Sequence, residues 1–447
     1  MERTLAFKLS TIGLLVALLL IALSSIGRLI VERQARRNGV MQDIARSSSG
    51  EQQITGPVLV IPYEKTVRKW RENDRGERHL EEREVSGQLH FLPEVFTLHG
   101  DIPTELRARG IYEARLYHAH LGITADFEVP LHYGLGSEIA AYRFGPPFIA
   151  VGVSDIRGIE SPLTAALDGV AVKLLPGTGT DLLQGGVHVA TPIAGPESAA
   201  HLQLKMDLPL LGTSEFHVVP VGRQTQISLK SNWPHPSFTG DFLPVQRKLT
   251  SDGFTAQWAT SFFSTNLEEA LHKCDEQGSC ANLAVNRVGV SFVDPVDQYL
   301  KTDRAIKYAL LFITLTFAGF FLFDVLKNLP VHPVQYGLVG AALALFYLLL
   351  LSLSEHVGFG VAYLAASAAC VGLIGFYVSH VLRSSARGLG FGCGLAVLYG
   401  CLYGLLSADD YALLMGSLLL FAVLTAVMVL TRNVNWSTIG AGQVTEA

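Results

Sequence analysis

Few groups of residues in this sequence have the types and spacing that catalysis or metal binding requires. His118 and His120 alternate along one predicted strand, so their side chains share a face and could begin a metal site. A protein-bound zinc ion needs at least three protein ligands, and spacing identifies no third ligand for this pair. Exposed or hydrogen-bonded strand histidines are the simpler interpretation.

The most distinctive polar motif is Trp233-Pro234-His235-Pro236, which Asp241 follows. The two prolines restrict the backbone and predict a rigid loop. Such a loop could present Trp233, His235 and Asp241 to a ligand. The alternative, which we favour, is a structural corner between two strands.

Other signatures of enzymes are absent from the sequence. Gly177-Thr178-Gly179 lacks the Lys-Ser/Thr pair of a phosphate-binding P-loop and indicates a turn. The sequence contains neither G-x-S-x-G nor H-E-x-x-H, and no Ser/His/Asp set can be assembled from spacing. We therefore expect a protein that is not an enzyme and that uses no cofactor or metal.

The five cysteines fall into two groups. Cys274 and Cys280 lie in a polar region, and a C-x5-C pair outside the cytoplasm predicts a disulfide. Two free thiols, or a metal site that adds His272, are the alternatives. The remaining three are small packing residues of apolar segments: Cys370, Cys393 and Cys401.

The elements that carry these residues are of two kinds, and the first kind is apolar helices. Five segments near the C-terminus are long enough to cross a bilayer, namely Ala305–Val325, Tyr336–Ser352, Val357–Val378, Leu389–Leu406 and Tyr411–Leu430. Glycines such as those of Gly400-x-x-x-Gly404 allow close helix packing. The sequence predicts a five-helix transmembrane bundle over 301–435 and a tail at 436–447.

A sixth apolar run, Leu9–Ile30, follows Arg3 and Lys8. It is either a retained signal anchor or a signal peptide cleaved after Ala22-Leu23-Ser24. The run is long for a signal peptide and lacks a helix breaker before that site. We therefore expect an N-terminal anchor at 1–30, and six spans in total.

The second kind of element is the short strand. Between the anchor and the bundle, alternating or continuous apolar runs recur between Gly, Pro and Asn turns, for example Gly56–Tyr63, Val85–Pro93 and Phe254–Ser261. This pattern predicts a large, mainly β, sandwich-like antiparallel domain over 31–300, built as two sheets or as two subdomains. A short helix at Ile30–Ser49 is expected to lead into it, with Arg33, Arg36 and Arg37 either near lipid headgroups or on a solvated face.

The distribution of positive charge predicts the orientation. Lys327, Arg383, Arg387 and Arg432 follow alternate spans, whereas the links around Glu355 and Asp409 contain no Lys or Arg. The positive-inside rule then places both termini in the cytoplasm and residues 31–300 outside it, in the periplasm of a Gram-negative cell. The arginines that follow the first span argue the other way. Large domains translocate largely regardless of charge, so the three later links decide the orientation.

Ionisable residues are nearly absent from the centres of the predicted spans. Glu355 and His356 lie in a predicted outer loop and face the same side as the junction that contains Asp297, Asp303 and Arg304. We interpret these five residues as candidates for coupling the β domain to the membrane bundle. Lys301 or Arg304 would be the partner of Glu355.

Several stretches are similar to one known family. They are SNWPHPSFTGDFLP (231–244), DQYLKTDRAIKYALLF (297–312), LSLSEHVGFG (351–360), GPVLVIPY (56–63), FIAVGVSDIRGI (148–159) and LLPGTG (174–179). In this order, and over nearly the whole chain, they resemble the CreD family of inner-membrane proteins. The resemblance implies a cell-envelope integrity protein associated with a two-component stress regulon. It implies no established catalytic residues.

Two classes of function follow from these patterns. The first is a non-enzymatic envelope protein whose β domain binds a cell-wall component or another envelope protein, with the lipid bilayer as its other partner. The second is a transporter or channel with the β domain as a lid, although transporters usually place ionisable groups within their spans. The net charge of −5 is mild and does not indicate nucleic-acid binding.

We predict that Cys274 and Cys280 form a disulfide in protein taken from the envelope. The closed loop is short, so the bond should stabilise the fold by less than the roughly 3 kcal/mol expected for a 15-residue loop. Peptide mass mapping without reduction measures this directly, and recovery of both thiols in alkylated form would refute the pairing.

Overall fold

The computed structural model describes residues 2–72, 78–267, 269, 271, 286–292, 298–327, 332–382, 384–407 and 412–432. The chain divides into two compact units. One comprises Met1–Asn38 and Val296–Ala447, and the other comprises Gly39–Pro295. The first boundary lies inside a single helix, α1 (Glu2–Ser47). The helix predicted at Ile30–Ser49 is confirmed as far as Ser47, but it is not a distinct element, because the anchor helix continues into it without a break.

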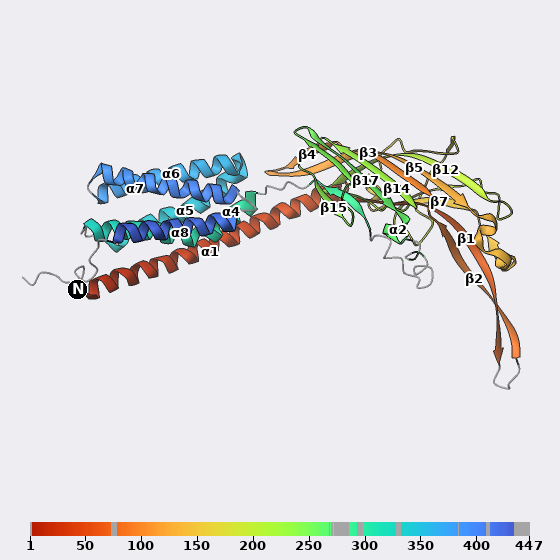
Figure 1. Cartoon of the computed structure of the whole chain (residues 1–447), viewed down its shortest axis with the longest axis horizontal. Coiled ribbons are helices and arrows are strands. Elements are labelled where there is room, and N and C mark those ends of the chain that lie inside the picture. The colour runs from red at the N-terminus through yellow and green to blue at the C-terminus, as the bar shows by residue number, and fades with distance from the viewer. Residues whose placement is uncertain are drawn as a thin grey trace, which may run out of the picture. The chain divides into compact units, whose positions relative to one another are not determined.

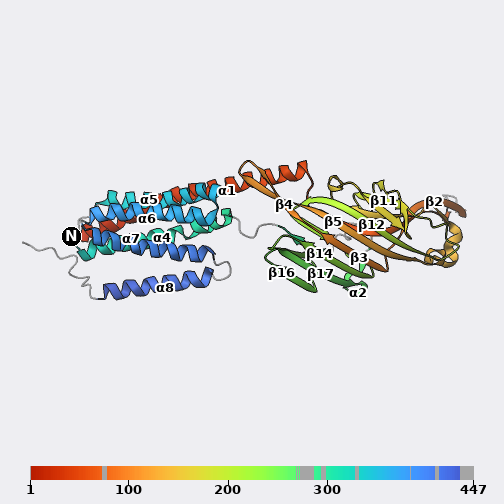
Figure 2. The same cartoon turned by 90° about the horizontal axis from the view of Figure 1, so that it is seen from above.

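The first unit is helical (Figures 1 and 2). Besides α1 it contains α4 (Gln298–Lys327), α5 (Pro333–Val357), α6 (Phe359–Val381), α7 (Ser385–Ser407) and α8 (Ala412–Thr431). Within the described residues, α1, α4, α5, α6 and α7 are the five helices long and apolar enough to cross a membrane. Helix α8 carries no charged residue and occupies the position of the last predicted span. The predicted architecture of an anchor and a C-terminal helical bundle is confirmed.

Local signals explain where these helices begin and end. His332 caps α5: its ring Nδ1 accepts a hydrogen bond from the Val334 N–H, and the side chain of Gln335 accepts one from the His332 N–H. Pro333 occupies the first helical position, where no N–H is needed. Gly358, with φ of 77°, then separates α5 from α6 in a conformation that favours glycine.

Helix α1 is a packed member of its unit. Leu23 is 3% exposed and belongs to the same hydrophobic cluster as Phe317 and Tyr336. A side chain at Gly340 of α5 would collide with Leu19 of α1, so the absence of a Cβ allows these two helices to approach closely. The anchor therefore belongs to the bundle by packing as well as by composition.

The second unit consists of two sheets, each of nine strands in the described part of the chain. The first sheet has the order β10 (Leu175–Pro176), β11 (Gly186–Ala190), β7 (Phe148–Val153), β1 (Gln52–Glu72), β13 (Glu215–Val218), β18 (Val288–Ser291), β15 (Ser237–Gly240), with β2 (Arg78–Phe91) and β6 (Tyr142–Phe144) also paired to β1. The second has the order β16 (Gln246–Thr250), β17 (Gly253–Ser261), β14 (Gln224–Ser231), β3 (Val95–Asp101), β5 (Tyr112–Val129), β12 (Ala200–Thr213), β8 (Thr164–Leu167), β9 (Val170–Val172), with β4 (Thr104–Arg109) paired to β5. Most pairs are antiparallel, as predicted, but β1 with β13 and β3 with β14 are parallel.

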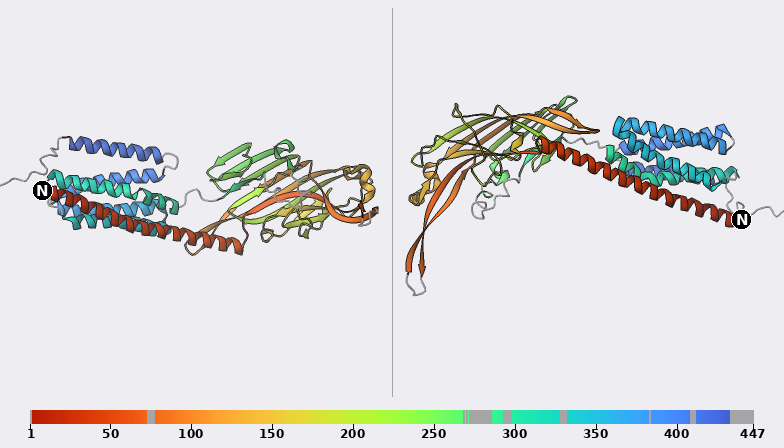
Figure 3. Two further views of the ribbon diagram at one scale, coloured as in Figure 1. Left: turned by 90° about the horizontal axis from the view of Figure 1, so that it is seen from below. Right: turned by 180° about the vertical axis from the view of Figure 1, so that it is seen from behind.

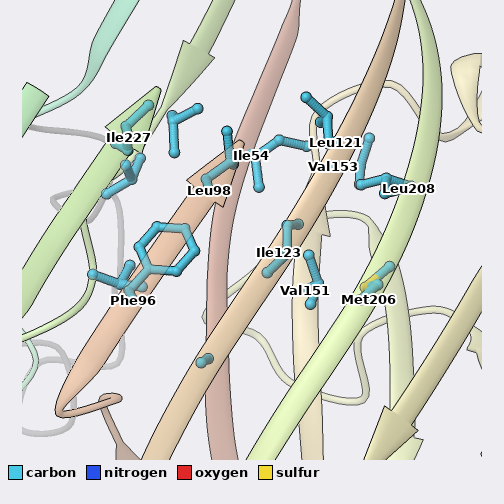
Figure 4. Packing of buried hydrophobic residues seen from close by; sticks show 14 of the residues in the cluster. Ile54, Phe96, Leu98, Leu121, Ile123, Val151, Val153, Met206, Leu208 and Ile227 are labelled. Atoms are coloured by element: carbon cyan, nitrogen blue, oxygen red, sulfur yellow. The ribbon is translucent and has the colours of Figure 1, made fainter. Parts of the chain in front are cut away.

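One hydrophobic core lies between the sheets (Figure 4). Side chains from β1 and β7 of the first sheet, such as Ile54 and Val151, meet Phe96, Ile123 and Met206 of the second. Strands β5 and β12 pair over 14 residues, from Ala200 with Val129 to Thr213 with Leu116. Because side chains alternate along a strand, this long pair supplies a continuous apolar face to the core.

The β1–β2 hairpin extends beyond the rest of its sheet (Figure 3). Its pairing continues to Glu72 opposite Arg78, and Arg68 forms an ion pair with Glu82 at 2.8 Å. The highly charged residues between the predicted strands Gly56–Tyr63 and Val85–Pro93 predict a solvated hairpin with its turn at Asn73–Gly76. The hairpin is confirmed, and the turn lies outside the described residues.

Candidate functional site

A buried amide organises the point where α1 ends and β1 begins. The side chain of Gln52 is fully buried, and its Nε2 lies 2.7 Å from Ser49 Oγ, 2.9 Å from Asp155 O and 2.9 Å from Leu211 O. Its Oε1 accepts hydrogen bonds from the Asp155 N–H and the Ser154 hydroxyl, both at 3.2 Å. One amide thus joins the chain after α1 to β12 and to the loop after β7.

Asp155 and Arg157 complete this cluster from the same loop. The Arg157 guanidinium donates to Asp155 at 2.6 and 2.9 Å and to the carbonyl of Arg46 in the last turn of α1 at 2.6 Å. A cation at this position also interacts favourably with the negative end of the helix dipole. The Arg157 hydrogen bonds and the Gly50 N–H hold the pKa of the Asp155 carboxyl well below its usual value. We call Gln52, Asp155 and Arg157 the helix-end cluster.

The helix-end cluster also lies close to the last described residues of the β domain. The Thr213 N–H donates to the carbonyl of Gly50, and the Phe292 N–H donates to the carbonyl of Ser214. The chain therefore enters and leaves the β domain at neighbouring points. A side chain at Gly158 would overlap Leu211 O and the Gln52 amide, so glycine is required there.

A second polar cluster lies in the helical unit. The Glu355 side chain is only 7% exposed, accepts a 2.9 Å hydrogen bond from the Tyr299 hydroxyl and lies 3.8 Å from the Arg33 guanidinium. Helices α1, α4 and α5 each contribute one of these residues. A buried carboxylate needs such partners, because leaving it unpaired is costly.

The other predicted coupling residues have different contacts. Lys301, predicted as a partner of Glu355, lies over the ring of Phe359, and Asp303 pairs with Lys307 at 2.7 Å. His356 is exposed and lies 3.1 Å from the carbonyl of Ser352 in its own helix. Asp297 lies outside the described residues. A role for Arg304 and the rest of this set in coupling the domain to the bundle stays a prediction.

The Trp233 loop has the features of the structural corner that we favoured. Trp233 is 6% exposed, its indole N–H donates to the carbonyl of His235 at 2.9 Å, and the Arg115 guanidinium stacks 3.7 Å from its ring. The indole is therefore enclosed in the domain and not presented to a ligand. Asp241 is exposed, and its N–H donates to the carbonyl of Arg287.

The histidine pair does not converge on a shared ligand. His118 lies 3.4 Å from Glu160 and 3.7 Å from Glu105, whereas the exposed His120 stands opposite Asp101 of β3 and Pro209 of β12. Among the described residues there is no group of three or more His, Cys, Asp or Glu arranged to hold a metal ion. Cys274 and Cys280 lie outside the described residues, so the disulfide stays a prediction.

No motif in the sequence predicts the pocket that the fold creates. A pocket of about 740 Å³ opens in the β domain and is lined by side chains that include His90, Glu94, Glu128, His201 and Arg223. These residues come from the ends of several strands and share no sequence motif. The one local signal is that charged residues directly adjoin buried apolar ones, as at Glu128-Val129.

We expect Asp155→Asn to lower the free energy of unfolding of the β domain by about 1.5–3 kcal/mol, the range for hydrogen bonds to charged groups. The pKa of Asp155 is lowered by folding, so its stabilising contribution is present above the unfolded carboxyl pKa of about 3.9 and is lost as the pH falls through the folded pKa. The difference between wild type and variant should therefore shrink below about pH 4. Denaturant unfolding of the full chain in detergent, followed by tryptophan fluorescence, measures this. Asp101→Asn, an exposed change on β3, is the matched control, and equal effects of the two variants would contradict the assignment.

For the second cluster we expect Tyr299→Phe to destabilise the helical unit by about 1–3 kcal/mol, because a buried acceptor loses its donor. Tyr308→Phe on the same helix should change stability by less than about 0.5 kcal/mol. Unfolding of the full chain in sodium dodecyl sulfate, read by circular dichroism, compares the two. If Tyr299→Phe matches its control, Glu355 does not depend on this hydroxyl.

Comparison with known proteins shows one relationship over the full length. The family model described as "Inner membrane protein CreD" matches residues 4–437. Inner membrane protein CreD of Escherichia coli (strain K12) is 39% identical over 439 residues, which cover 98% of this chain and 94% of that protein. Among solved structures, an M1 zinc metallopeptidase from Deinococcus radiodurans aligns with 38% of each chain at 10% identity and a TM-score of 0.20, too low to support an argument. The family match, the relative and the apolar helices agree: this chain is a multi-pass inner-membrane protein of the CreD family.

Proposed function

We propose that this protein is a non-enzymatic inner-membrane protein that supports the integrity of the cell envelope, with a β domain that binds an envelope component or a partner protein. The observation that carries this proposal is the pocket in the β domain. Its volume of about 740 Å³ is typical of binding sites. Its lining combines an apolar wall with a few charged side chains, which is also the usual composition of such sites.

The polar residues singled out from the sequence favour binding over catalysis. Glu355 is hydrogen-bonded to Tyr299, Trp233 is enclosed by its own loop, and His118 lies between two carboxylates. Acid–base catalysis requires a group that can reach a substrate and exchange a proton with it. Glu355 and Trp233 are instead enclosed within the fold, and His118 is in contact with Glu105 and Glu160.

The hydrogen bonds of polar side chains inside the bundle also favour a binding protein over a transporter. The hydroxyls of Thr316, Ser354 and Ser367 each donate to a carbonyl in the preceding turn of their own helix. The Tyr363 hydroxyl donates to the carbonyl of Tyr399. Ion-coupled transporters use titratable side chains that face a shared path. The hydroxyl groups of Thr316, Ser354 and Ser367, which bond to the backbone of their own helices, do not form such a path.

The proposal includes an orientation with both termini in the cytoplasm and the β domain in the periplasm. It rests on the positive links that follow α4 and α6 and on the absence of Lys and Arg around Glu355. A single reactive cysteine in the β1–β2 hairpin should react with a membrane-impermeant maleimide in spheroplasts, whereas one near Arg387 should react only after lysis. The reverse pattern would show that the orientation is wrong.

The function is tested by complementation. In a Gram-negative host that lacks its own family member, the wild-type chain should restore tolerance to a membrane-perturbing detergent such as deoxycholate. A chain with His118→Gln and Glu160→Gln should restore it equally, because a binding protein does not need their proton transfer. Loss of complementation by this double variant at unchanged protein level would favour an enzyme, and failure of the wild type would refute the envelope role.

A further inference from the structure

We infer that the pocket of the β domain takes an amphipathic ligand that carries a protonated amine beside an apolar chain. The inference rests on the proposed binding function and names the chemical class of the ligand. Three features of the pocket favour such a ligand: the place of the pocket in the fold, its apolar wall and the charged side chains at its rim.

The pocket lies where strand ends from both sheets meet. In the second sheet, β3 begins beside the end of β5, and β12 begins there too, since Val95 is opposite Asp126 and Ala200 is opposite Val129. The first sheet contributes Phe91, the last residue of β2. The helix-end cluster adjoins Thr213, at the other end of β12. The contacts that hold the end of α1 therefore lie at the opposite end of β12 from the pocket.

The inner wall is apolar. Phe91, Leu92, Val129, Pro130 and Leu271 all line the pocket. Val129 is 2% exposed and Leu271 is 6% exposed, so the wall is continuous with the packed interior of the domain. A hydrocarbon chain placed against this wall would lose its contact with water, which is favourable in proportion to the area buried.

The described residues that line the pocket carry more carboxylates than guanidinium groups. Glu94 and Arg223 form an ion pair at 3.4 Å, and the Arg223 guanidinium also lies 5.4 Å from the ring of Phe262. Arg223 is therefore held against one carboxylate, and Glu128 supplies a second. Among the described residues that line the pocket there are thus two carboxylates and one guanidinium, together with the imidazoles of His90 and His201. A protonated amine complements this rim, whereas an anionic head group would be repelled.

The rim and the wall together favour a molecule with a cationic end and an apolar body. Two sources would supply this chemistry: the head group of an aminophospholipid such as phosphatidylethanolamine, or a soluble alkylamine. Both place an ammonium group near Glu128 and hydrocarbon near Phe91 and Val129. The experiment below separates them.

Hydrogen–deuterium exchange mass spectrometry on the full chain in detergent reads the pocket locally. At pH 7, octylamine should slow exchange in segments 88–94, 126–131 and 198–203 by about threefold, because a bound ligand suppresses local opening. Two compounds at the same concentration serve as controls: octanol tests the effect of the hydrocarbon chain alone, and octanoate tests a head group of the opposite charge. Protection by octanoate equal to that by octylamine would overturn the inference.

Two variants test the site itself. Glu128→Gln should weaken the apparent affinity for octylamine about fivefold, as expected for loss of one partly exposed ion pair. Glu113→Gln at the other end of β5 is the matched control and should leave the affinity unchanged. Ala200→Trp should fill the pocket and abolish the protection, with Lys205→Trp on the same strand as its control. Unchanged protection in Glu128→Gln would refute the role of the carboxylate.

A second pair of probes, two lysophospholipids, distinguishes a lipid head group from a soluble amine as the ligand. Protection by lysophosphatidylethanolamine but not by lysophosphatidylglycerol of equal chain length would assign a lipid head group. Protection by octylamine alone would assign a soluble amine. If no amine protects these segments while the wild-type chain still restores detergent tolerance, the ligand inference fails and the envelope role stands.

Discussion

The hydrogen bonds of the Gln52 side chain are the interaction on which the β domain depends most. This one buried amide contacts the chain after α1, the loop after β7 and the end of β12. Its five partners use both its donor and its acceptor groups, so it is satisfied without water. A residue of another shape would leave several backbone groups unpaired at the point where a membrane helix becomes a strand. The close approach of Gly158 is part of the same constraint.

The sequence predicts the type of most elements because their apolar periodicity is strong. Continuous apolar runs predict α4 to α8, and alternating runs predict β5 and β14. The sequence does not predict strand β12: apolar residues alternate almost perfectly along Ala200–Thr213, but Pro209 within it usually argues against a strand. The sequence also predicts a helix at Ile30–Ser49, but it does not indicate that this helix and the anchor form one element, α1, whose Ile44 packs against Ala114 and Leu116 of β5.

Site residues were less predictable because their partners are distant in the sequence. Glu355 could be recognised as unusual, but its contact with Arg33 joins residues that only the packing of α1 against the bundle brings together. The pocket is a stronger example. Three of its residues belong to different strands: Glu94 precedes β3, Glu128 lies in β5, and Arg223 precedes β14. Only the pairing of β3 with β5 and β14 places them at one end of the sheet. No local pattern encodes such a convergence.

Charged side chains are paired in the helix-end cluster and in the Glu355 cluster but are not balanced in the pocket, and this difference is relevant to function. In the helix-end cluster Asp155 is matched by the Arg157 guanidinium and the Gly50 N–H, and Glu355 is matched by Tyr299 and Arg33. Matched groups of this kind hold a structure in place and have no capacity left for a ligand. The described residues that line the pocket include one carboxylate more than guanidinium groups, beside apolar side chains. A carboxylate in excess beside an apolar wall gains an ionic partner when an ammonium group arrives, and this is why we propose that the β domain binds its ligand at this opening.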